Sequence, residues 1–80
     1  MIDKIGGIEG KDDFIRFLKD LAMDYKEHSG QWVNTTVDDC LLQMASWIED
    51  YSECSANDIM WDKVDFRVLA SILYMGKIYE

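Results

Sequence analysis

The sequence predicts an all-α fold, a three-helix bundle with elaborated loops, because apolar residues recur at helical spacing in three separate segments. Loops of roughly ten residues separate these segments, which fits a small bundle with long connections. Of the 80 residues, 49% are hydrophobic and 12% are aromatic, enough for one compact core without disulfides or metal. We therefore expect an extended lead-in over residues 1–10 and a single helical domain over residues 11–80.

The first helix is expected from Lys11 to His28. Its apolar face repeats at the i, i+3, i+4, i+7 spacing and comprises Phe14, Phe17, Leu18, Leu21, Ala22 and Tyr25. Gly10 is expected as the N-cap, and the two acids in the first turn oppose the helix dipole. Gly30 is expected to stop the helix by adopting a positive φ.

The second helix is expected from Val37 to Tyr51 or Glu53. Thr36, with Asp39 three residues later, resembles a capping box. The helix has a wide apolar arc, formed by Val37, Cys40, Leu41, Met44, Ala45, Trp47, Ile48 and Tyr51. An arc this wide predicts a central helix that touches the other two, with Trp47 in the core.

The third helix is expected to begin between Asp62 and Asp65, with acidic residues in its first turn. Its predicted buried side comprises Phe66, Leu69, Ala70, Ile72, Leu73 and Met75. Gly76 weakens this helix by roughly 1 kcal/mol relative to alanine. The preceding run Ile59-Met60-Trp61 is too short for a helix, and we expect it to be extended.

The chain is acidic, with sixteen acidic and eight basic residues and a formal net charge of −8. Such a surface repels nucleic acid and anionic membranes on average, whereas it suits a basic protein partner. No signal segment follows Met1, and no run approaches the roughly 18 apolar residues of a membrane span. Two cysteines are too few for a secreted disulfide scaffold, so we expect a cytoplasmic protein.

The sequence contains no arrangement typical of catalysis. Three pairs of acids are adjacent, namely Asp12/Asp13, Asp38/Asp39 and Glu49/Asp50. Neighbours at i and i+1 diverge on a helix, so such a pair does not converge on one substrate. Cys40, Cys54 and His28 lack the close-spaced ligand pair of a zinc site, and a single histidine leaves no catalytic triad to assemble. We predict no catalytic residue, no cofactor, no metal site and no enzymatic activity.

A stripe of acids on the first helix is the predicted binding site for a basic protein. Its members, Asp20, Asp24 and Glu27, lie on one side of the helix at i, i+4 and i+7. Trp32 and Trp61 lie in loops, where an aromatic side chain serves either the core or an interface, so both are candidates for this surface.

These features favour a small non-catalytic protein-interaction module, of which an immunity-like or antitoxin-like inhibitor of a basic partner is one form. The alternative is a self-associating structural domain. The homodimer face would then comprise Trp32, Trp61, Tyr74 and Tyr79.

Several motifs resemble those of a family of short bacterial proteins classed as a domain of unknown function. They are Trp32-x-Asn34-x-Thr36, Ala45-x-Trp47-Ile48-Glu49-Asp50-Tyr51, Trp61-Asp62 and Ile72-Leu73-Tyr74-Met75-Gly76-Lys77-Ile78-Tyr79-Glu80, within residues 12–80. Val33 replaces an acidic residue of the family pattern, and Val64 stands where a helix-starting Pro is frequent. The resemblance implies a bacterial, cytoplasmic, stand-alone domain and brings no known activity or catalytic residue.

Overall fold

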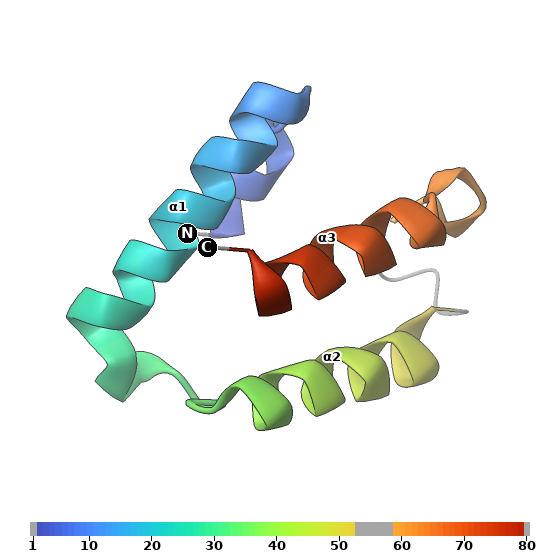
Figure 1. The fold of residues 1–80 in the computed structure, drawn as a ribbon. Coiled ribbons are helices and arrows are strands. Elements are labelled where there is room, and N and C mark those ends of the chain that lie inside the picture. The colour runs from blue at the N-terminus through green and yellow to red at the C-terminus, as the bar shows by residue number, and fades with distance from the viewer. Residues whose placement is uncertain (1, 53–58, 80) are drawn as a thin grey trace. The chain divides into compact units, whose positions relative to one another are not determined.

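The computed structural model describes residues 2–52 and 59–79, and three α-helices account for most of them (Figure 1). The α-helices are α1 (Lys11–His28), α2 (Val37–Tyr51) and α3 (Phe66–Ile78). Three short 3-10 helices accompany them, η1 (Ile2–Gly7), η2 (Ser29–Gln31) and η3 (Trp61–Lys63). The described ranges contain no β-strand, so the predicted all-α class with three helices is confirmed.

The chain divides into two compact units, Met1–Met44 and Ala45–Glu80. The first unit contains η1, α1, η2 and the beginning of α2, and the second contains the end of α2, η3 and α3. Helix α2 continues without a break across the boundary between them. The prediction of one helical domain over residues 11–80 stays a prediction.

The N-terminal segment differs from the extended lead-in that we expected, because Ile2–Gly7 form the 3-10 helix η1. A backbone hydrogen bond from Ile8 N–H to the Ile5 carbonyl, 3.2 Å long, closes its last turn. The side chain of Lys4 reaches Asp20 of α1, with 3.2 Å between Nζ and the carboxylate oxygen. This ion pair holds η1 against α1, which the composition of the segment did not reveal.

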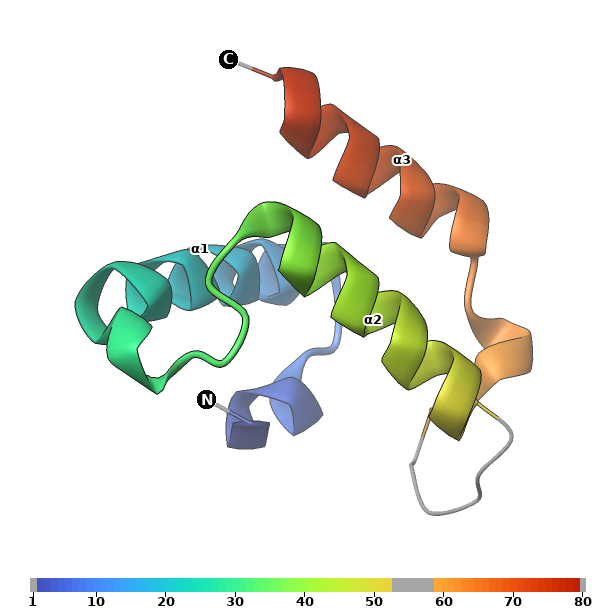
Figure 2. The same cartoon turned by 90° about the horizontal axis from the view of Figure 1, so that it is seen from below.

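Helix α1 begins and ends at the predicted residues, but its end has a different geometry. Gly10 is the N-cap as expected, in extended conformation. Gly30, by contrast, does not adopt a positive φ, and none of the described residues does. The helix instead tightens into η2, where Trp32 N–H donates to the Ser29 carbonyl at 3.0 Å, and the chain changes direction there (Figure 2). The 3-10 turn satisfies a terminal carbonyl, so no left-handed residue is needed.

Helix α2 begins at the predicted cap. The Thr36 hydroxyl accepts a hydrogen bond from Asp39 N–H at 3.4 Å, and Cys40 N–H donates to the Thr36 carbonyl at 2.9 Å. The first contact satisfies a backbone N–H that the first turn of a helix leaves without a partner, and the second is the first i→i−4 hydrogen bond of the helix. Thr36 therefore caps α2 as predicted, and this contact is one half of the capping box expected from Thr36 and Asp39.

Aromatic rings organise the second unit. Trp47 of α2 contacts Tyr51, with ring centroids 5.9 Å apart, and Trp61, at 6.0 Å. Trp61 in turn stacks on Phe66, at 6.1 Å and an interplanar angle of 12°. Trp47 remains 42% exposed, so our expectation of a buried core residue was wrong. Its neighbours are flat rings that cover only part of its surface.

The approach to α3 also differs in detail from the prediction. Trp61 begins η3 rather than ending an extended run, because Lys63 N–H donates to the Met60 carbonyl at 2.9 Å. Asp65 is the N-cap of α3, and its carboxylate accepts from Arg67 N–H at 3.1 Å and Val68 N–H at 3.2 Å. The predicted acids precede the first turn instead of lying in it. The helix continues through Gly76.

Replacing Asp65 by Ala should destabilise the second unit by about 1 kcal/mol, because two backbone N–H groups lose their acceptor. Urea unfolding followed by circular dichroism measures the loss. Asp62→Ala is the matched control, since it removes the same charge from a residue that is not the N-cap. Equal losses in the two variants would show that the cap contributes nothing beyond its charge.

Candidate functional site

A clasp between Trp32 and α1 fixes the loop that leads to α2. The indole Nε1–H of Trp32 donates to a carboxylate oxygen of Asp24 at 2.8 Å. The ring packs edge-to-face on Tyr25, with centroids 5.1 Å apart and planes at 79°. The Tyr25 hydroxyl donates to the Thr35 carbonyl at 2.8 Å. Two side chains of α1 therefore hold both ends of the segment from residue 32 to residue 35.

The clasp forms one wall of a pocket of about 240 Å³ within the first unit. The pocket is lined by Tyr25, Trp32, Asn34, Thr35, Thr36, Val37, Cys40 and Leu41. Its surface is mostly apolar, and the half-buried Cys40 is a free thiol. We did not predict this pocket, because its walls converge only when the clasp folds the loop back onto the end of α1.

The three acids of α1 that we predicted to bind a partner differ from one another in their surroundings. Asp20 pairs with Lys4, whereas Asp24 accepts from Trp32 and lies 3.6 Å from His28 Nδ1. Glu27 is exposed, and no described ion pair includes it. The structure thus brings Asp24 and Trp32 together as partners of each other. Their role in binding a second protein stays a prediction.

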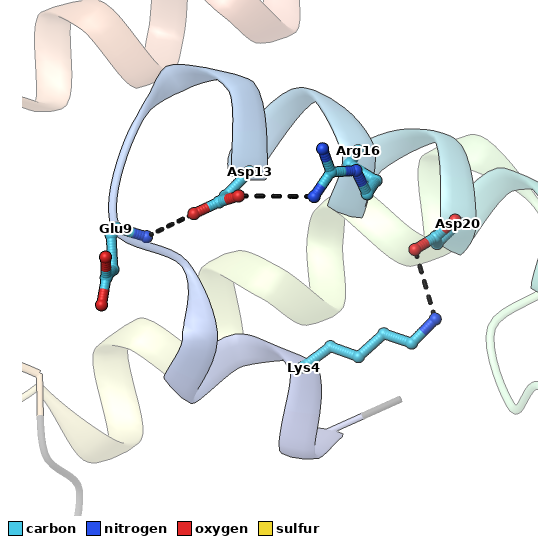
Figure 3. A network of polar contacts seen from close by, with 5 residues as sticks. All are labelled: Lys4, Glu9, Asp13, Arg16 and Asp20. Carbon is cyan, nitrogen blue, oxygen red and sulfur yellow. Dashed lines mark hydrogen bonds and ion pairs between the residues drawn. The ribbon is translucent and has the colours of Figure 1, made fainter.

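A polar network surrounds the start of α1 (Figure 3). Asp13 accepts from Glu9 N–H at 3.1 Å with one carboxylate oxygen and contacts Arg16 at 3.5 Å with the other. Lys4 and Asp20 form the second part of the network. A hollow of about 300 Å³ lies beside them, and its lining combines the four charged side chains of the network with Gly7, Ile8 and Phe17. Each of the two cations already has a carboxylate at contact distance, so the hollow offers no uncompensated charge to a ligand.

Trp61, the remaining predicted site residue, lies in the aromatic cluster of the second unit. Its rings contact Trp47 and Phe66, as described above, and its Nε1–H is shielded from solvent without an acceptor in the described part of the chain. The two loop tryptophans therefore differ. The Trp32 side chain donates a hydrogen bond to a carboxylate, whereas the contacts described for the Trp61 side chain are with other aromatic rings.

The net charge of the protein is confined to one stretch of the chain. Residues 27–62 hold eight of the sixteen acids and none of the eight Lys and Arg residues, which gives this stretch a formal charge of −8. The other residues hold eight acids and eight bases, and their charges cancel. The sequence shows this asymmetry directly, but we had considered only the overall charge.

Helix α2 lies in the middle of the acidic stretch and carries four acids without a single Lys or Arg. Asp38 and Glu49 are eleven residues apart, as are Asp39 and Asp50, and eleven residues make about three helical turns. All four acids therefore lie on the side of α2 opposite its apolar arc. Leu42, which is 63% exposed, lies among them. We call these five residues the acidic face of α2.

The ionised state of Asp38 is stabilised locally. A hydrogen bond from the Thr36 hydroxyl, and further ones from the backbone N–H groups of Asp39 and of Asp38 itself, lower the pKa of the Asp38 carboxyl below its ordinary value. The negative charge is also favoured by its place in the first turn of α2, at the positive end of the helix dipole. The acidic face therefore keeps this charge as the pH falls toward the ordinary range of a carboxyl group.

The remaining side chains that could bind a metal or react do not cluster in the described residues. In residues 2–52 and 59–79, no three side chains of His, Cys, Asp or Glu lie close enough together to hold a metal ion. Within the same ranges, none of the helices combines the length and the apolar character that crossing a bilayer requires. Cys54 falls outside the described residues.

Trp32→Phe should lower the free energy of unfolding by about 1 kcal/mol, because it removes the N–H that Asp24 accepts while keeping an aromatic ring. Thermal unfolding of the purified chain measures the change. Trp47→Phe is the control, because it makes the same substitution at a tryptophan whose described contacts are ring contacts. A loss no larger than that of the control would contradict the clasp.

Thr36→Ala should raise the pKa of Asp38, because it removes the hydroxyl donor that most strongly favours the carboxylate. NMR titration of the Asp38 carboxyl measures this, with Thr35→Ala as the neighbouring control. The folded-state pKa is depressed, so Asp38 contributes stability above its ordinary pKa and loses it as the pH falls through the folded value. An unchanged titration in Thr36→Ala would contradict the assignment.

Comparisons with known proteins add a family but no activity. A search of curated proteins finds no match, and a search of solved structures finds none either. One family model, described as a family of unknown function (DUF7660), matches residues 10–80 and thus nearly the whole chain. The resemblance to a domain of unknown function is confirmed. The chain belongs to the DUF7660 family.

Proposed function

We propose that this chain is a non-catalytic protein-interaction module that binds a basic protein surface through the acidic face of α2. The observation that carries the proposal is the confinement of the whole net charge to residues 27–62, with α2 in their middle. A surface on which one sign of charge dominates attracts partners of the opposite sign and raises the rate of encounter.

The acids of α2 are available to a partner. Asp38, Asp39, Glu49 and Asp50 are all exposed, and no described ion pair includes any of them. The acids of α1 are less suitable, because Asp20 would have to release Lys4 and Asp24 would have to release Trp32. Glu27 is exposed, has no described ion pair and begins the acidic stretch, so it can extend the binding surface.

Leu42 supports a protein partner rather than a free cation or simple solubility. Interfaces between proteins commonly place an apolar side chain at the centre and polar or charged residues at the rim. On α2, Leu42 follows Asp38 by one turn and precedes Glu49 by about two turns, so charges surround it. An inhibitor of a basic enzyme or toxin, of the immunity or antitoxin kind, is one concrete form of this function.

The test starts from a partner captured by the intact chain at low salt and identified by mass spectrometry. We expect that partner to be basic and its affinity to fall as salt increases, because screening weakens charge-steered binding. Asp39→Asn/Asp50→Asn should weaken binding about three- to tenfold at low salt, which corresponds to two exposed charge contacts.

The control, Glu9→Gln/Asp12→Asn, changes the net charge from −8 to −6 in the same way but outside residues 27–62. Both variants leave Asp38 and its capping contacts intact. Equal losses in the two variants would show that only net charge matters, and would contradict a role for α2. A chain for which no partner shows salt-dependent binding would contradict the function itself.

A further inference from the structure

We draw no further inference here: the strongest candidate, the mostly apolar pocket of about 240 Å³ between the Trp32 clasp and the first turn of α2, is bordered by the apolar arc of that helix, and nothing in the structure shows what covers it.

Discussion

The hydrogen bond between the indole of Trp32 and the carboxylate of Asp24, 2.8 Å long, joins the end of α1 to the loop that follows it. Tyr25 holds the other end of the same loop through the Thr35 carbonyl. Thr36, the next residue, caps α2, so the clasp fixes the place where that helix starts. The first residue of a helix sets the direction of each side chain along it, because successive residues are rotated by about 100°. The position of the acidic face of α2 therefore depends on contacts made by α1.

Helix positions could be predicted from the sequence because periodicity and capping are local. Phe14, Phe17 and Leu21 recur at helical spacing, and Thr36 caps α2 by contacting residues within four positions of itself. Two of the contacts that the sequence did not predict are of longer range. Lys4 meets Asp20 across sixteen residues, and Trp32 meets Asp24 across eight, so both contacts depend on a loop geometry that no local pattern specifies. For the same reason the predicted acid stripe on α1 did not reveal that two of its three members already have partners.

Two surfaces of the molecule have opposite character, and the difference is encoded in where the charges lie. The acidic face of α2 holds four carboxylates without a compensating base, whereas α3 has two bases and no acid. In water at physiological ionic strength, charges are screened beyond about 8 Å, so the local distribution of charge matters more for contact than the overall −8 does.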